Sequence, residues 1–191
     1  MPAHREIEIK FEVRDQKQLT RKLKAFGFRL TTARTLEVNT LYDFPRQMLR
    51  QRGEMLRIRN YGGKWTITHK AKGTPGRHKS RVETETTMQD GEKLQAIFAS
   101  LGLRPIFRYE KYRAEWSDGI GHLVLDETPI GSYAELEGPP HWIDRTAKRL
   151  GVTRDEYITD NYAGLFWAWK NRTDSTAEEM TFRAVKRKHL S

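Results

Sequence analysis

The sequence of 191 residues contains no cysteine, which excludes disulfide bonds and metal sites built from thiolates. It also lacks any apolar run approaching the roughly 20 residues that a membrane-spanning helix requires, and its polar beginning differs from a secretory signal. Internal repeats and low-complexity tracts are absent as well. These absences predict a soluble cytoplasmic protein that has no membrane partner.

The charge balance is strongly positive. There are 35 Lys and Arg residues against 25 Asp and Glu residues, a formal net charge of +10. This excess favours polyanionic partners such as nucleotides, polyphosphate, nucleic acid or anionic lipid, without choosing among them. Basic residues also end the polar stretch 173–191, which we interpret as a flexible tail. Nucleic-acid contact by this tail is the less favoured alternative.

Residues 6–13 alternate charged and apolar side chains without interruption. In a β-strand, this alternation places Glu6, Glu8 and Lys10 on one face and apolar residues on the other. The pattern returns along most of the chain, which favours a single domain. Further strands are predicted in the segments 28–44, 55–59, 65–70, 81–86, 109–115, 121–128 and 132–138.

Apolar residues recur at helical spacing after Asp15 and after Asp90, each of which is a candidate helix cap, and again after Pro139. If these helices cover the apolar face of the sheet from outside, closure of the sheet turns its charged face inward. The predicted fold is therefore α+β, a closed eight-stranded antiparallel barrel with helices packed on the outside. An open sheet with a solvated charged face is the alternative.

An enclosed lumen of this kind carries charges of both signs. Guanidinium and ammonium groups suit phosphate oxygens, and clustered carboxylates suit a hard cation such as Mg²⁺ or Mn²⁺ that bridges to phosphate. Burying charges that are poorly paired is costly, and a bound polyanion with divalent cations would relieve that cost. The pattern thus predicts a site for a triphosphate and a metal ion.

The motifs along the chain resemble those of the CYTH superfamily, also called triphosphate tunnel metalloenzymes. The resemblance begins with the Glu-x-Glu-x-Lys pattern of residues 6–10 and covers roughly residues 4 to 170. In chain order, the other matching segments are Tyr42-Asp43, Leu56-Arg57-Ile58-Arg59, Thr68-His69-Lys70, Arg81 to Glu85, Lys111-Tyr112-Arg113, Leu125-Asp126 and Ile130 to Gly138. The resemblance implies one CYTH domain over residues 1–172 and an eight-stranded tunnel.

The resemblance also implies a role for each charged residue. The predicted metal ligands are Glu6, Glu8, Asp126, Glu135 and Glu137, which would hold Mg²⁺ or Mn²⁺. The predicted triphosphate-binding residues are Lys10, Arg57, Arg59, Lys70, Arg81, Lys111 and Arg113. Residues expected to take part in catalysis are Glu6, Glu8, Lys10, Glu85 and Glu135, with Glu85 or Glu135 as a base for an attacking water.

Within this superfamily the chain is most similar to class IV adenylyl cyclases, which convert ATP to cyclic AMP and pyrophosphate. The segment 157–162 is similar to a C-terminal tyrosine element of cyclase-like members, although Asn161 stands where serine is usual. A triphosphatase acting on inorganic triphosphate, thiamine triphosphate or a nucleoside triphosphate is the alternative. A polyphosphate-binding module without turnover is a third possibility. The expected partner is the triphosphate substrate, and a homodimer is compatible with the resemblance.

Overall fold

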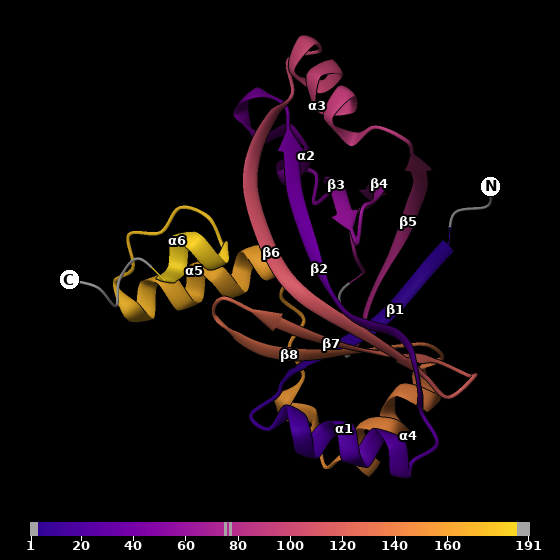
Figure 1. Ribbon diagram of the computed structural model, residues 1–191. Helices are drawn as coiled ribbons and strands as arrows, with labels where there is room; N and C mark the ends of the chain where they lie inside the picture. Colours follow the sequence, from indigo (N-terminus) through magenta and orange to yellow (C-terminus); the bar gives the residue numbers. More distant parts are fainter. Residues whose placement is uncertain (1–3, 75, 77, 187–191) are drawn as a thin grey trace.

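The computed structural model describes residues 4–74, 76 and 78–186 (Figure 1). Within this part of the chain, eight antiparallel strands close into a barrel in the order β1, β5, β4, β3, β2, β6, β7, β8. This closure confirms the predicted α+β fold. The strands are β1 (His4–Glu12), β2 (Arg29–Asp43), β3 (Met55–Tyr61), β4 (Lys64–Lys70), β5 (Lys79–Met88), β6 (Arg104–Ser117), β7 (His122–Thr128) and β8 (Gly131–Glu137).

The helices begin where the sequence offers caps. The Asp15 and Asp90 side chains accept hydrogen bonds from the backbone N–H of Gln18 at 2.8 Å and of Lys93 at 2.9 Å, which confirms both caps. Among the described residues, no helix is long and apolar enough to cross a membrane. The helices are α1 (Gln16–Ala25), α2 (Met48–Gln51), α3 (Gly91–Ser100), α4 (Pro140–Leu150), α5 (Tyr162–Thr173) and α6 (Phe182–Lys186), and short 3₁₀ turns span Pro45–Gln47 and Arg154–Glu156.

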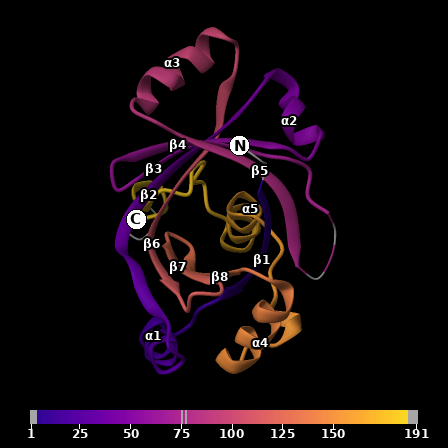
Figure 2. The same ribbon diagram turned by 90° about the vertical axis from the view of Figure 1, so that its right-hand side faces the viewer.

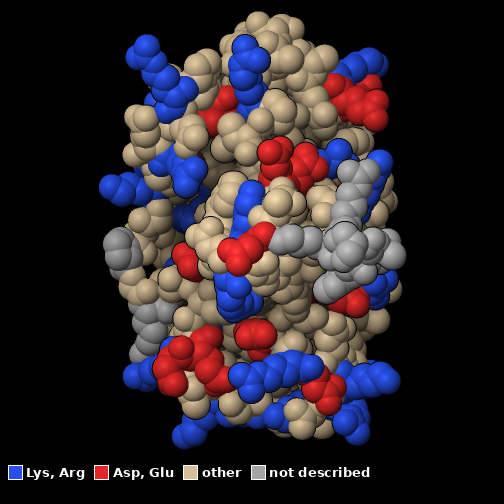
Figure 3. All heavy atoms as spheres, turned by 90° about the vertical axis from the view of Figure 1, so that its left-hand side faces the viewer, with Lys and Arg blue, Asp and Glu red and all other residues tan. Residues whose placement is uncertain are grey.

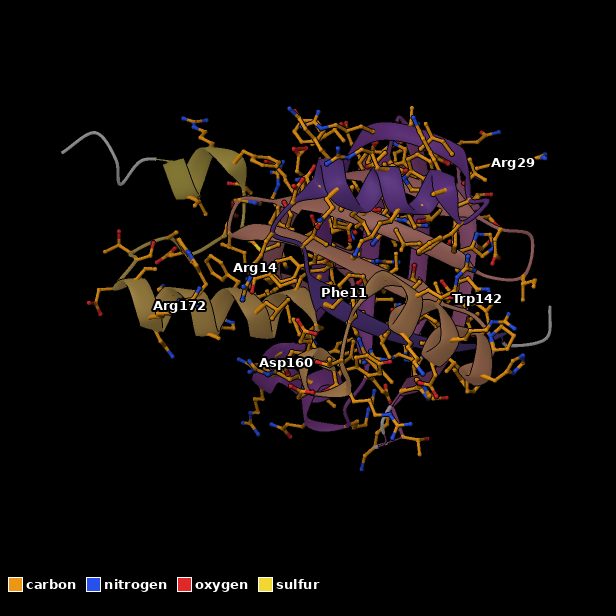
Figure 4. All side chains as sticks on the ribbon, turned by 90° about the horizontal axis from the view of Figure 1, so that it is seen from below. Phe11, Arg14, Arg29, Trp142, Asp160 and Arg172 are labelled. Atoms are coloured by element: carbon orange, nitrogen blue, oxygen red, sulfur yellow. The ribbon has the colours of Figure 1, made fainter. Side chains whose placement is uncertain are left out.

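The hydrophobic core lies between the barrel and the helices that cover it. Helices α1 and α4 pack beneath β1, β7 and β8, where Phe11, Leu23 and Trp142 are buried (Figures 1 and 4). On another side, α3 buries Phe98 against Ile58 of β3. The alternation of the strands therefore sends apolar side chains outward to the helices and charged side chains inward, as predicted.

Helix α5 departs from the prediction that all helices pack on the outside. The view along the barrel shows α5 in the middle of the ring of strands, across one end of the lumen (Figure 2). Its first turn contributes to the lumen, because Asn161, Tyr162 and Ala163 line the central cavity. The helix can take this place because Phe166 is fully buried in a cluster with Phe107 and Tyr109 at that end.

The segment after α5 also differs from the expected flexible tail. Met180 is completely buried, and its backbone N–H and C=O bond to the Arg108 carbonyl at 3.1 Å and the Glu110 N–H at 2.9 Å. The Phe182 ring lies 5.2 Å from the Tyr112 ring on the outer face of β6. Three apolar residues of this polar stretch, Met180, Phe182 and Val185, thus hold the chain to the barrel. Residues 187–191 lie outside the described part. The domain limits at residue 172 stay a prediction.

Candidate functional site

The charged faces of the strands converge on one cavity of about 430 Å³ inside the barrel. Strand pairing explains the convergence, because Glu8 lies opposite Glu137 and Lys10 lies opposite Glu135. All but one of the predicted site residues line this cavity, and the exception is Asp126. The lining members are Glu6, Glu8, Lys10, Arg57, Arg59, Lys70, Arg81, Glu85, Lys111, Arg113, Glu135 and Glu137.

Basic side chains gather on the strands around β2. Arg57 and Arg59 come from β3 and Lys111 and Arg113 from β6, and these four residues form what we call the cation wall. Strand β2 lies between β3 and β6 in the barrel. Each of the four cations is at most partly exposed, and its donors point into the lumen or to a carboxylate. Arginine and lysine in this arrangement suit the oxygens of a polyphosphate.

Asp126 shares the inward-facing side of β7 with His122 and Val124, but it is not among the residues that line the cavity. Its side chain is fully buried, and its oxygens accept hydrogen bonds from Lys111 Nζ at 2.8 Å, from Arg113 Nη2 at 2.6 Å and from the Tyr162 hydroxyl at 2.5 Å. A buried carboxylate bound by three donors is a counter-ion for those cations. The position of Asp126 supports anchoring of the cation wall better than it supports metal coordination.

Glu135 is held in a similar way. It forms ion pairs with Lys10 Nζ at 3.2 Å and with Arg113 Nη2 at 2.7 Å. Burial alone would raise the pKa of Glu135, but Lys10 and Arg113 outweigh burial and hold this pKa well below its ordinary value. Such a carboxylate is a weak proton acceptor. Its place fits charge balance in the lumen better than the predicted role as a base.

Glu85, the other predicted base, stands nearer to solvent. One oxygen accepts a 2.6 Å hydrogen bond from the Thr68 hydroxyl and the other accepts a 3.1 Å bond from Arg59 Nη2. Its side chain keeps 37% of its surface exposed. This exposure gives Glu85 a route for exchanging a proton with water, which the buried Glu135 lacks.

Three carboxylates crowd the wall opposite the cation wall. Glu6 and Glu8 of β1 and Glu137 of β8 form what we call the acid cluster. Burial, followed by the nearby charges of Glu6 and Glu8, raises the pKa of Glu137 to about 7. Burial and a hydrogen bond with Glu83 also raise the pKa of Glu6. Burial is the largest cause of both shifts, and neighbouring carboxylates add to it.

Lysines on β4 and β5 balance part of this charge. Lys70 Nζ lies 3.0 Å from Glu6 and also forms an ion pair with Glu83. Lys79 Nζ lies 2.8 Å from Glu8. Glu6, Glu8 and Glu83 therefore each have a lysine as a neighbour.

A divalent metal ion fits the acid cluster by its chemistry. Carboxylate oxygens are the hard ligands that Mg²⁺ and Mn²⁺ prefer, and Glu6, Glu8 and Glu137 all line the same cavity. In the described residues, no three His, Asp or Glu side chains already converge tightly enough to enclose an ion. Mg²⁺ is usually held by one or two carboxylates together with substrate phosphates and water.

Two aromatic residues of the site were not among the predicted site residues. The Tyr162 ring lies 4.6 Å from Lys10 Nζ and 4.5 Å from Lys111 Nζ, so α5 places a cation–π contact at the closed end. Tyr109 lines the cavity beside it. Tyr162 belonged to a motif with a suspected role, but no alternation signal places a helical residue in a barrel lumen.

Several charged lining residues were missed too, although their parity could have revealed them. Lys79 is the first residue of β5, and its spacing from Arg81 places it on the lumen face. Glu115 and His122 also line the cavity. Glu37 lies on the inward parity of β2, within a segment whose mixed composition hid the alternation. It is fully buried behind the cation wall.

The lumen thus holds two walls in which one sign of charge predominates, each with paired counter-charges of the other sign. In the order of the closed sheet, β2 is four strands away from β1 in both directions, so the cation wall and the acid cluster face each other. On the outer surface over the α5 end, basic and acidic side chains are interspersed instead (Figure 3). A closed barrel with opposed charged walls defines a class of protein suited to enclosing a compact polyanion.

The chain belongs to the CYTH domain family, whose model matches residues 4–139, from β1 to the residue pair after β8. A Methanocaldococcus jannaschii protein, provisionally named an adenylate cyclase, is 28% identical over 171 residues, which cover 84% of this chain and 97% of that protein. Helices α4 and α5 lie beyond the residues that the family model matches.

Solved structures share the same architecture. A Vibrio parahaemolyticus protein, also provisionally named an adenylate cyclase, matches with a TM-score of 0.74 at 19% identity and covers 85% of this chain and 97% of its own. A Hippeastrum protein, described as a provisional adenylyl cyclase with a dominant triphosphatase activity, matches with a TM-score of 0.63 at 20% identity, over 85% of this chain and 95% of its own. At these identities the two structures establish the shared fold.

Proposed function

We propose that this chain is a divalent-metal-dependent enzyme that holds a triphosphate substrate in the barrel and converts ATP to cyclic AMP and pyrophosphate. The observation that carries the proposal is the opposition of the cation wall to the acid cluster across one cavity. A pure anion binder gains nothing from carboxylates that repel its ligand. A metal bound to the substrate phosphates gives those carboxylates a purpose.

The basic and the acidic residues of the lumen would have different roles. Arg57, Arg59, Lys111 and Arg113 would bind phosphate oxygens and stabilise the charge that builds on them during transfer. Glu6, Glu8 and Glu137 would hold Mg²⁺ or Mn²⁺, which supplies Lewis-acid neutralisation of the phosphates when bound. A bound cation would favour the ionised form of Glu137.

In the cyclisation, the ribose 3′-oxygen attacks the α-phosphorus and forms the new P–O bond. The bond from the α-phosphorus to the bridging oxygen breaks, and pyrophosphate leaves with that electron pair. The hydroxyl proton passes to Glu85, which is the lumen carboxylate that is open to water, and then to solvent. The cation wall stabilises the charge on both products.

Hydrolysis of a triphosphate is the second candidate. The same walls would hold the substrate, with water attacking the terminal phosphorus in place of the ribose hydroxyl. The Hippeastrum neighbour supports this candidate, since it is described as having a dominant triphosphatase activity on the same fold. Inorganic triphosphate, thiamine triphosphate and nucleoside triphosphates are the substrates to compare.

The test is to incubate the purified protein with ATP and Mg²⁺ or Mn²⁺ and to separate the products. Cyclic AMP with pyrophosphate supports the cyclase, and ADP with orthophosphate supports the triphosphatase. Two variants of β6 serve as a pair, because Lys111 faces the lumen and Arg108 points outward with half of its side chain exposed. Lys111→Ala should abolish most turnover, whereas Arg108→Ala should retain it.

The result that overturns the proposal is binding without turnover. Tight binding of inorganic triphosphate that persists in EDTA, with no product from ATP or from inorganic triphosphate, would identify a polyphosphate-binding module instead. Equal loss of activity in both β6 variants would place the chemistry elsewhere.

A further inference from the structure

Glu37 occupies the centre of the cation wall. Its strand, β2, separates β3 from β6, and Glu37 pairs in register with Lys111 across the β2–β6 ladder. The side chain is completely buried. Its carboxylate lies 3.4 Å from Lys111 Nζ, 3.7 Å from Arg113 Nε and 3.8 Å from Arg59 Nη1, so one acid is close to three of the four cations of the wall.

Two buried carboxylates therefore bracket the same cations from opposite sides. Asp126 lies 2.8 Å from Lys111 Nζ, and Glu37 lies 3.4 Å from the same atom on the neighbouring strand. Buried cations are costly without such counter-charges. Burial would raise the pKa of Glu37, but Lys111 and Arg113 lower it far below its ordinary value, so Glu37 carries a full negative charge.

The two carboxylates interact with the wall differently. Asp126 takes short hydrogen bonds from Lys111, Arg113 and Tyr162. Glu37 accepts one hydrogen bond, from Asn39 Nδ2 at 2.9 Å on its Oε1, and its Oε2 has no hydrogen-bond partner within the described part of the chain. Glu37 thus attracts Arg59 and Arg113 at 3.7–3.8 Å without occupying their N–H donors.

We propose that Glu37 is a positioning residue that holds Arg59, Lys111 and Arg113 in the geometry needed for phosphate without itself taking hydrogen bonds from their N–H donors. The inference rests on the proposed function of the lumen. Glu37 also moderates the positive potential of the wall, because its charge lies within 4 Å of the three groups. It therefore sets both the strength of anion binding and the alignment of the cations.

These two effects have opposite signs in a Glu37→Gln variant. Removing the negative charge should tighten binding of inorganic triphosphate at least about fivefold, because the wall becomes more positive. Loss of the centring charge should lower kcat for the substrate that the wild type turns over by about tenfold or more, because the cations lose their alignment. Loss of folded protein alone would weaken binding and turnover together.

The experiment measures the triphosphate Kd by calorimetry and kcat and KM by product assay, with folding checked by circular dichroism. Glu37→Asp keeps the charge with a shorter side chain, so its Kd should stay near that of the wild type while kcat falls less than in Glu37→Gln. Glu110→Gln is the matched control, because Glu110 is a partly buried acid on the outer face of β6. It should change neither quantity.

If Glu37→Gln is folded and matches Glu110→Gln in Kd and kcat, Glu37 has no positioning role, although wild-type turnover would still support the proposed function. If Glu37→Gln does not fold, Glu37→Asp decides: an unchanged kcat overturns the inference and a selective fall in kcat supports it. A wild type that neither binds triphosphate nor turns it over overturns the proposed function and this inference with it.

Discussion

The hydroxyl group of Tyr162 donates a 2.5 Å hydrogen bond to Oδ2 of Asp126, which links the first turn of α5 to the interior of the barrel. The same aspartate oxygen accepts from Lys111 and Arg113. One carboxylate thus connects the helix that covers the end of the lumen with the cations proposed to bind phosphate. The position of α5 and the order of the cation wall depend on each other through this residue.

Tyr162→Phe should lower the free energy of unfolding by about 1–3 kcal/mol, because it removes a buried hydrogen bond to a charged acceptor. Urea unfolding followed by circular dichroism measures the change. Tyr112→Phe is the control, since Tyr112 contacts Phe182 and Arg34 through its ring on the outside of the barrel. Equal destabilisation by both variants would contradict a special role for the Tyr162 hydroxyl.

Glu137→Gln should raise the Mn²⁺ concentration that gives half-maximal activity by roughly tenfold, because it removes a proposed ligand charge from the acid cluster. Asp126→Asn should leave that concentration nearly unchanged and raise KM instead, since Asp126 anchors the cations. Activity measured over a Mn²⁺ titration separates the two variants. A raised Mn²⁺ requirement in Asp126→Asn, with no change in Glu137→Gln, would restore Asp126 as the metal ligand.

Asp118 should make the fold sensitive to acid. Burial would raise its pKa, but hydrogen bonds from Trp142 Nε1 and from the backbone N–H of Ile120 and Gly121 lower the pKa below its ordinary value. A lowered folded-state pKa means that the stabilisation is complete above the unfolded-state value and is lost as pH falls through the folded-state value.

Asp118→Asn should therefore cost about 1–2 kcal/mol of unfolding free energy at pH 7 and progressively less below about pH 4. Urea unfolding of the wild type and the variant, at pH 7 and below about pH 4, gives the difference in unfolding free energy. A cost that stays constant down to pH 2.5 would show that the Asp118 charge does not contribute.

Gly121→Ala should destabilise the protein by about 1–3 kcal/mol, because the added Cβ would lie 2.6 Å from the buried Trp142 ring. Gly164→Ala in α5 is the matched control, because its Cβ would meet Asp160 at an ordinary 3.5 Å. Thermal melts should show a lower Tm for the first variant and little change for the second. Similar melting temperatures would mean that the Trp142 ring moves aside.

Much of the fold and of the lumen could be predicted because strand alternation is a strong local signal. The parity of Glu6, Glu8, Arg57 and Glu137 alone indicated their common cavity, and the structure confirms that they line it. The metal, catalytic and substrate roles of these residues stay predictions, as do the cytoplasmic location and the homodimer.

Contacts between distant segments were beyond the reach of that signal. Whether the Asp126 carboxylate stays open to the lumen or is covered by donors depends on Lys111 and Tyr162, which lie 15 and 36 residues away in sequence. Burial of Met180 is likewise settled by its backbone pairing with Tyr109 of β6 and by the apolar cluster around Phe166, and not by its polar neighbours in the chain. Strand parity predicts which face of the sheet a side chain points to. The distant residue that the side chain contacts is decided by tertiary packing.

The place of α5 has a kinetic consequence. Because this helix lies across one end of the barrel, we expect substrate and products to pass through the other end. There, His122 and Glu137 adjoin a surface hollow that is also lined by Ile7, Ile120 and Pro139. If products leave by that end, the product seated deeper departs after the one nearer to it. Release should be ordered, and the last product to leave should be the competitive inhibitor of the next round.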